Sequence, residues 1–202
     1  MSQFSDIHRE TTAVYERNAH GWDERRPRSL IEKPWLDKLL NSMAPGSSVL
    51  DVGCGAGEPI SRYVLKRGFS LTGVDSSPKM IEICKTRFPD QSWIVMDMRE
   101  LSLGERFAAI IAWDSFFHLS PDEQRQVLQR FLTHLDSRGA LLLTVGHESG
   151  EVLGVVEGED VYHSSLEPQE YEHILRSRGL GNIEMTLQDK SCGDRTVLLA
   201  RP

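Results

Sequence analysis

Three glycines at alternate positions, Gly53, Gly55 and Gly57, follow an apolar run at 48–52 and precede a helical pattern at about 60–66. Because glycine has no Cβ, the chain can turn tightly there and a ligand can approach the backbone closely. The helix behind the turn directs free N–H groups at whatever lies in it. This stretch therefore predicts a binding site made of a strand, a glycine-rich turn and a helix.

Acidic residues stand at the ends of the next three predicted strands. Asp75 follows the apolar run 69–74, Asp97 follows 92–96, and Asp114 follows 107–113. In open α/β sheets, ligands bind at the carboxyl ends of the strands. Three carboxylates at one edge would repel one another unless a ligand or a helix cap engages them, so this edge is the predicted site.

A dinucleotide is the first ligand to consider. Its fingerprint requires glycines in the pattern G-x-G-x-x-G, and Glu58 occupies the third glycine position here. An acid at the end of the second strand suits a nicotinamide-dependent oxidoreductase equally well, but the chain has no Tyr-x-x-x-Lys dyad. That class is kept as an alternative.

The glycine spacing, with Asp51 ahead of it, resembles motif I of the class I S-adenosylmethionine-dependent methyltransferases. The resemblance covers about residues 10–201. It implies that the turn holds the methionine part of S-adenosylmethionine and that Asp75 binds the ribose hydroxyls. It also implies that Asp97 contacts the adenine amino group, beside apolar side chains. The cofactor-binding residues predicted in this way are Gly53, Cys54, Gly55, Gly57, Asp75, Ser76, Met80, Asp97, Met98, Trp113, Trp22 and Arg26.

The function implied by this resemblance is transfer of a methyl group from S-adenosylmethionine to a small-molecule acceptor by in-line displacement, with S-adenosylhomocysteine as the product. The chain lacks the Asn-Pro-Pro-Tyr and Asp-Pro-Pro-Tyr motifs of nucleic-acid base methyltransferases, which argues against a DNA substrate. It also lacks the paired acids of catechol-type enzymes, so no metal site is expected. A regulatory protein that binds S-adenosylmethionine without turnover is a second alternative.

In-line methyl transfer mainly requires that the two reactants be held in line. A base is needed only when the acceptor atom carries a proton. The predicted catalytic residues are His118 and Asp114, and the predicted substrate contacts are Tyr15, His147, Tyr162 and His163. Arg195 is interpreted as a solvated hairpin residue. The remaining histidines, interpreted as surface or packing residues, are His8, His20, His134 and His173.

Composition narrows the classes of protein. The 202 residues carry a net charge of −7 with no basic run, which argues against a nucleic-acid or anionic membrane surface. Three cysteines without metal-ligand spacing favour reduced thiols, and the N-terminal residues do not resemble a signal peptide. We therefore expect a cytoplasmic protein, and the sequence leaves its oligomeric state open.

Alternating strands and helices, with nearly continuous apolar strands, predict an α/β protein with a doubly wound, seven-stranded, mostly parallel sheet. Helices are expected on both faces, and a C-terminal antiparallel hairpin at 183–188 and 196–200. Residues 1–45 form the expected helical lid segment and residues 46–202 the expected core of a single domain. Other expected elements are a helix at 29–43, a strand at 140–145, a loop at 146–158 and a helix at 167–178.

Overall fold

The computed structural model describes residues 3–202, so the first two residues of the expected lid segment lie outside the description. Within this range, one sheet has seven strands in the order β3-β2-β1-β4-β5-β9-β8. Strands β3, β2, β1, β4 and β5 are mutually parallel, whereas β9 runs antiparallel to β5 and to β8. The predicted fold class is therefore confirmed, including the antiparallel hairpin that the last two strands of the chain, β8 and β9, form.

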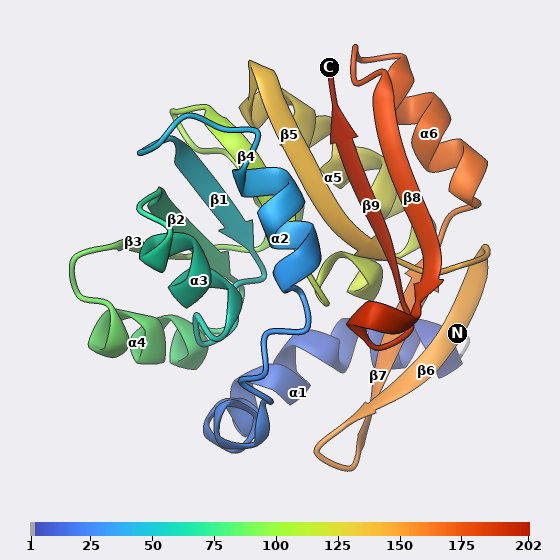
Figure 1. Ribbon diagram of the computed structural model, residues 1–202. Helices are drawn as coiled ribbons and strands as arrows, with labels where there is room; N and C mark the ends of the chain where they lie inside the picture. Colours follow the sequence, from blue (N-terminus) through green and yellow to red (C-terminus); the bar gives the residue numbers. More distant parts are fainter. Residues whose placement is uncertain (1–2) are drawn as a thin grey trace.

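The strands and helices follow the expected alternation (Figure 1). The strands of the sheet are β1 (Ser48–Val52), β2 (Ser70–Asp75), β3 (Ser92–Val95), β4 (Phe107–Ala112), β5 (Leu135–Val145), β8 (Asn182–Asp189) and β9 (Arg195–Arg201). The α-helices are α1 (Gln3–Arg25), α2 (Lys33–Leu40), α3 (Ile60–Lys66), α4 (Pro78–Arg87), α5 (Pro121–His134) and α6 (Pro168–Arg176), and the short 3₁₀ turns are η1 (Met98–Glu100), η2 (Phe116–His118) and η3 (Lys190–Cys192).

Two apolar layers hold the sheet between its helices. On one face, α5 and α6 bury side chains such as Phe131 and Tyr171 against alternate residues of the strands. On the other face, α2, α3 and α4 bury Trp35, Val64 and Ile81. Because side chains of a strand alternate between faces, the same strands supply both layers. The central strands are therefore buried on both sides, which is why their sequences are nearly continuously apolar.

Helix α1 and a two-stranded ribbon lie outside these layers, at the carboxyl ends of the parallel strands (Figure 1). The ribbon consists of the antiparallel strands β6 (Gly150–Val156) and β7 (Glu159–Ser165). The predicted loop at 146–158 is thus wrong, because most of it is β6. The glycine and acidic residues of this stretch hid the valine-rich strand, which pairs with β7.

Two further boundaries differ from the predictions. The helix expected at 29–43 is shorter in the structure and corresponds to α2. It cannot begin at residue 29 because Leu30 adopts a left-handed backbone (φ 50°) that a helix does not contain. Strand β5 begins at Leu135 and not at residue 140, and its pairing with β4 shifts register between Phe107 and Ala109.

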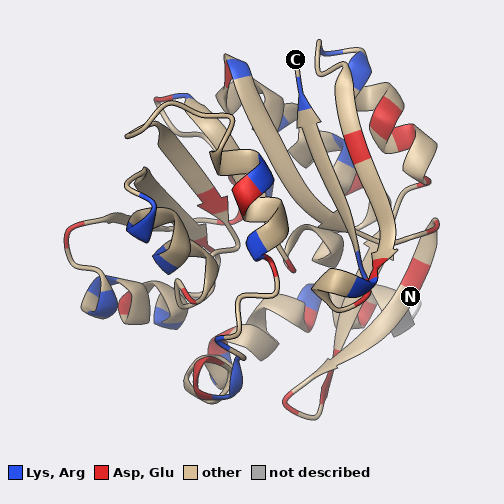
Figure 2. Cartoon of the chain, in the orientation of Figure 1, with Lys and Arg blue, Asp and Glu red and all other residues tan. Residues whose placement is uncertain are grey.

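Acidic and basic residues are interspersed along α1 and α4 (Figure 2). Among residues 3–202, no helix combines the length and the hydropathy needed to cross a membrane.

Candidate functional site: a cavity beneath helix α1

The glycine turn between β1 and α3 brings its backbone close to neighbouring side chains. Gly53 has φ 71°, and a Cβ there would lie 2.3 Å from the Cβ of Ser115. Gly55 has φ 53°, and a Cβ there would lie 3.2 Å from the Trp22 ring. A side chain at either position would strain the backbone and would also lie too close to Ser115 or Trp22. The backbone of this turn therefore lines a space that any larger residue would narrow.

Asp75, at the end of β2, is fixed against this turn. One carboxylate oxygen accepts a hydrogen bond from the backbone N–H of Gly55 at 2.9 Å, and the other accepts one from Ser77 at 2.9 Å. Burial raises the pKa of Asp75, and the two backbone N–H groups oppose that rise. Each oxygen keeps a second lone pair, so the carboxylate can also accept hydrogen bonds from a ligand in the cavity.

A cavity lies between this turn, the ends of β2 and β4, and helix α1. Most residues predicted to bind the cofactor line it, and α1 lies across it with Thr11, Tyr15 and Trp22 facing inward. The predicted residues in its lining are Tyr15, Trp22, Arg26, Gly53, Cys54, Gly55, Asp75, Ser76, Met80, Asp97, Met98, Trp113, Asp114 and His118.

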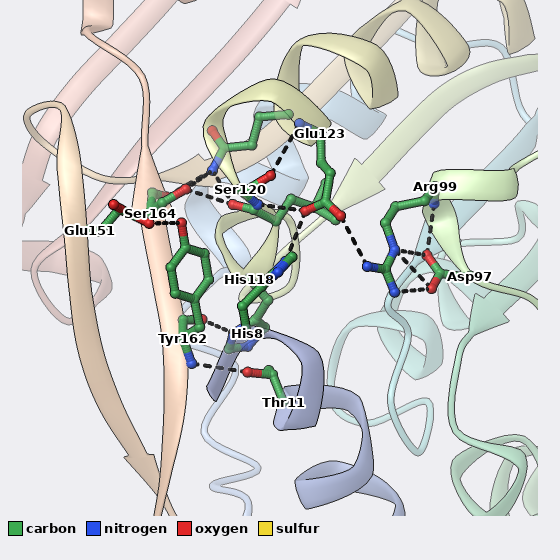
Figure 3. Close-up of polar contacts among 12 residues, drawn as sticks. His8, Thr11, Asp97, Arg99, His118, Ser120, Glu123, Glu151, Tyr162 and Ser164 are labelled. Atoms are coloured by element: carbon green, nitrogen blue, oxygen red, sulfur yellow. Dashed lines mark hydrogen bonds and ion pairs between the residues drawn. The ribbon is translucent and has the colours of Figure 1, made fainter. Parts of the chain in front are cut away.

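Four predicted site residues do not line this cavity. Gly57 lies behind the turn, where a Cβ would be 2.9 Å from the ring of Phe88. His147 is half exposed and lies 3.5 Å from Glu148. Tyr162 directs its hydroxyl to Glu151 at 2.6 Å (Figure 3). His163 lines a separate hollow described below.

The end of the cavity at Asp97 carries a chain of charged groups (Figure 3). Arg99 donates hydrogen bonds to both carboxylate oxygens of Asp97 and, at 3.0 Å, to Glu123. Glu123 also lies 2.8 Å from Nε2 of His8 on α1. Burial raises the pKa of Asp97, but the hydrogen bonds from Arg99 outweigh it and hold that pKa below its ordinary value.

His8, which the sequence predicts to be a surface or packing residue, also lines the cavity. Its place follows from the docking of α1 across the cavity, which the sequence of an amphipathic helix does not specify. Asp51, Arg99 and Ser115 likewise line the cavity without having been predicted as site residues. Asp51 was visible as part of the glycine motif, and Arg99 and Ser115 directly follow the predicted residues Met98 and Asp114 in the sequence.

His118 is held by both of its ring nitrogens. Nδ1 lies 2.8 Å from the carbonyl oxygen of Tyr162, and Nε2 lies 2.9 Å from the hydroxyl of Tyr15. A carbonyl oxygen only accepts, so Nδ1 carries the proton, and the Tyr15 hydroxyl therefore donates to Nε2. Burial lowers the pKa of His118 to about 4 and raises that of Tyr15. At neutral pH the pair consists of a neutral imidazole and a phenol.

This burial makes the stability of the protein depend on pH. An unfolded histidine has a pKa of about 6.5, so below that value the unfolded chain takes up a proton that the folded chain refuses until about pH 4. The protein therefore becomes less stable as pH falls from about 6.5 to about 4. We expect the neutral His118 to lower the free energy of unfolding by about 2 kcal/mol between pH 7 and pH 5.

Urea denaturation of the protein and of His118→Asn at both pH values checks this expectation. Other groups titrate in both proteins, so the informative quantity is the difference between their free energies of unfolding. It should shift by about 2 kcal/mol in favour of the variant at pH 5. An unchanged difference would show that the pKa of His118 in the folded protein is the same as in the unfolded chain.

Asp114, at the end of β4, is held by two arginines. Nε of Arg195 lies 2.8 Å from Oδ1, Nη2 lies 2.7 Å from Oδ2, and Nη1 of Arg26 lies 3.3 Å from Oδ2. The interpretation of Arg195 as a solvated residue is therefore wrong, because the β8–β9 turn carries its guanidinium to the end of β4. Arg26 also lies 5.1 Å above the ring of Trp22.

A second hollow adjoins the cavity on the side of the β6–β7 ribbon. Tyr15, Trp22, Arg26 and Asp114 line both spaces, so the two are neighbours across these side chains. The residues that line the second hollow alone are Phe117, Val155, Val156, Val161, His163, Gly193 and Arg195.

The chain is similar to known methyltransferases over part of its length. Residues 49–139 match the family described as "Methyltransferase domain". Over 129 residues the chain is 33% identical to the magnesium-protoporphyrin O-methyltransferase of Rhodobacter capsulatus, covering 60% of this chain and 54% of that one. It is also 33% identical over 111 residues to a dTDP-3-amino-3,6-dideoxy-alpha-D-glucopyranose N,N-dimethyltransferase of Streptomyces fradiae, covering 54% and 43%. The chain thus spans about half the length of these relatives.

A solved structure shares the fold. The 1,6-didemethyltoxoflavin-N1-methyltransferase of Burkholderia thailandensis, solved with 1,6-didemethyltoxoflavin and S-adenosylhomocysteine bound, superposes with a TM-score of 0.72 at 20% identity, covering 100% of this chain and 91% of that one. Residues 49–139 are therefore similar to a methyltransferase domain, and the chain has the Rossmann-like fold of this solved methyltransferase.

Proposed function

We propose that the protein transfers a methyl group from S-adenosylmethionine to a small-molecule acceptor. The observation that carries the proposal is the position of Asp75, whose carboxylate lines the cavity beside a glycine turn that would not tolerate a Cβ. S-adenosylmethionine supplies an electrophilic methyl group on a sulfonium whose sulfur leaves as a neutral thioether. The protein has to bind this donor, exclude water and aim the acceptor.

The residues around the cavity suit a donor of this kind. Asp75 would hold the ribose hydroxyls, and Met80 and Met98 would flank the adenine beside Asp97. The indole Nε1 of Trp113 is buried and has no hydrogen-bond partner among residues 3–202, although Trp113 lines the cavity. Burying an N–H group without an acceptor costs free energy, unless a ligand in the cavity accepts its hydrogen bond. Arg26 would face the methionine carboxylate, because its two contacts with Asp114 and Glu32, at 3.3 and 3.4 Å, are long.

Helix α1 would act as the lid of the site. It is fastened at both ends of the cavity, by His8 to Glu123 and by Glu16, which accepts hydrogen bonds from the Ser77 hydroxyl and the Lys79 N–H at the start of α4. A donor as large as S-adenosylmethionine would enter when these contacts open. Tyr15 and His118 would then lie between the donor and the second hollow, where they would position the acceptor.

The two relatives and the solved structure are named as methyltransferases of an amino sugar, a magnesium protoporphyrin and 1,6-didemethyltoxoflavin. They support a small-molecule acceptor for this chain and do not choose among such compounds. We also place the protein in the cytoplasm, since its three cysteines are buried free thiols.

Transfer of label tests the catalytic proposal. The protein is incubated with S-adenosylmethionine carrying a tritiated methyl group and with a deproteinised small-molecule extract of cells. We expect label to appear in an extract compound only when the protein is present. Binding of S-adenosylhomocysteine without any label transfer would contradict catalysis and favour a regulatory protein that senses the cofactor.

A further inference from the structure

The second hollow contains a histidine that the cofactor cavity does not use. His163 projects from β7 over Gly154 of β6, where a Cβ would lie 2.4 Å from the imidazole ring. Glycine at this position leaves the space that the ring fills. The ring of Phe117 stands edge-on at 4.7 Å, and the ring of His118 lies 4.9 Å away. Packing therefore fixes the ring at the wall of the hollow.

The ring nitrogens of His163 are available, in contrast with those of His118. Within residues 3–202, no hydrogen bond or ion pair engages either nitrogen of His163, and the side chain is only half buried. Both nitrogens of His118 are engaged, by the Tyr162 carbonyl and the Tyr15 hydroxyl. Of these two neighbouring histidines, His163 is the one with a free lone pair facing a space that a ligand can enter.

The charges around this ring keep it neutral near pH 7. Burial lowers the pKa of His163, and the carboxylate of Asp114 opposes that shift. The other titratable or charged groups that line the hollow are Tyr15 on α1, Arg26 after it, and Arg195 on β9, and His118 on η2 packs behind the ring. Arg195 and Arg26 share the charge of Asp114, so little of it remains to attract a proton to the ring.

We propose that the methyl acceptor enters through the second hollow with a protonated oxygen or nitrogen, and that His163 removes this proton during methyl transfer. This inference rests on the proposed function. It assigns a catalytic residue, and it restricts the acceptor to hydroxyl or amine compounds with an apolar part to pack on Phe117, Val155 and Val161. A thiolate or another acceptor that arrives without a proton would have no use for this group.

The step balances without an additional reactant. A lone pair on the acceptor atom forms the new bond to the methyl carbon, and the carbon–sulfur bond breaks with its electron pair remaining on sulfur. As this bond forms, the acceptor atom would gain a positive charge, and its proton passes at the same time to a ring nitrogen of His163. The imidazolium then releases that proton to solvent, because the side chain is only half buried.

The test compares His163→Gln with the matched control His173→Gln. Glutamine keeps hydrogen-bonding capacity but does not titrate near neutral pH, and His173 is an exposed histidine on α6 that lines neither space. Label transfer from tritiated S-adenosylmethionine to the small-molecule extract is measured from pH 6 to pH 10, and S-adenosylhomocysteine binding is measured by calorimetry.

For His163→Gln we expect transfer at pH 7 to fall by about 10²- to 10⁴-fold with unchanged S-adenosylhomocysteine affinity, as for loss of a general base. Its residual activity should rise with pH as the acceptor loses its proton to solvent. His173→Gln should behave as the unmodified protein. Wild-type rates and pH profile in His163→Gln would overturn the assignment of the base. Binding of S-adenosylhomocysteine with no transfer by the unmodified protein would instead overturn the proposed function, and the assignment with it.

Discussion

Replacing Asp75 with alanine is expected to weaken binding of S-adenosylhomocysteine by about 1.5–3 kcal/mol, roughly 10- to 150-fold, which is the cost of losing hydrogen bonds to a charged group. The ribose hydroxyls would lose their acceptor. The N–H groups of Gly55 and Ser77 would lose theirs as well, which would loosen the turn beneath the ligand. Calorimetric titration measures the effect directly.

Asp97→Ala is the matched comparison, because Asp97 also lines the cavity but is already engaged by Arg99. Its effect on the affinity should be smaller than that of Asp75→Ala. Equal affinity of Asp75→Ala and the unmodified protein would show that this carboxylate does not contact the ligand.

Gly53→Ala is expected to lower the free energy of unfolding by more than about 2 kcal/mol and to abolish S-adenosylhomocysteine binding. A left-handed backbone costs an L residue roughly 1–2 kcal/mol. The new Cβ would in addition lie 2.3 Å from the Cβ of Ser115, a short side chain that cannot bend away. Ser115 is itself anchored through its hydroxyl, which donates to the Val52 carbonyl at 2.8 Å, so the loop after β4 would have to move.

Gly68→Ala provides the control for backbone strain alone. Gly68 has φ 82°, and a Cβ there would meet no atom within 4 Å. We expect it to cost only about 1–2 kcal/mol of stability and to leave ligand binding unchanged. Urea denaturation and calorimetry of both variants are the measurements. Similar losses in the two variants would mean that the turn at Gly53 has room for a side chain.

The parallel core could be predicted from the sequence because each of its signals is local. Ser77 before Pro78 and Ser120 before Pro121 begin α4 and α5, and both serine side chains cap those helices in the structure. The β6–β7 ribbon could not be predicted in this way. Gly150 and Gly154 are poor strand residues by themselves, and Gly154 is needed only because His163 crosses over it from the opposite strand.

The candidate site was predictable to the same extent and for the same reason. Glycines and acids at strand ends identify the cavity, because a strand delivers its last residue to a fixed edge of the sheet. Contacts between distant segments left no such signal: His8 with Glu123, Arg195 with Asp114, and Tyr15 with His118. Each depends on how α1 or the β8–β9 turn docks, which is a property of tertiary packing.

The central claim is that the glycine turn and Asp75 bind S-adenosylmethionine and not a dinucleotide. Calorimetric titration of the protein with S-adenosylhomocysteine, with NADH titrated in parallel, tests it most directly. We predict micromolar binding of S-adenosylhomocysteine and no binding of NADH. Binding of NADH alone, or of neither compound, would contradict the claim.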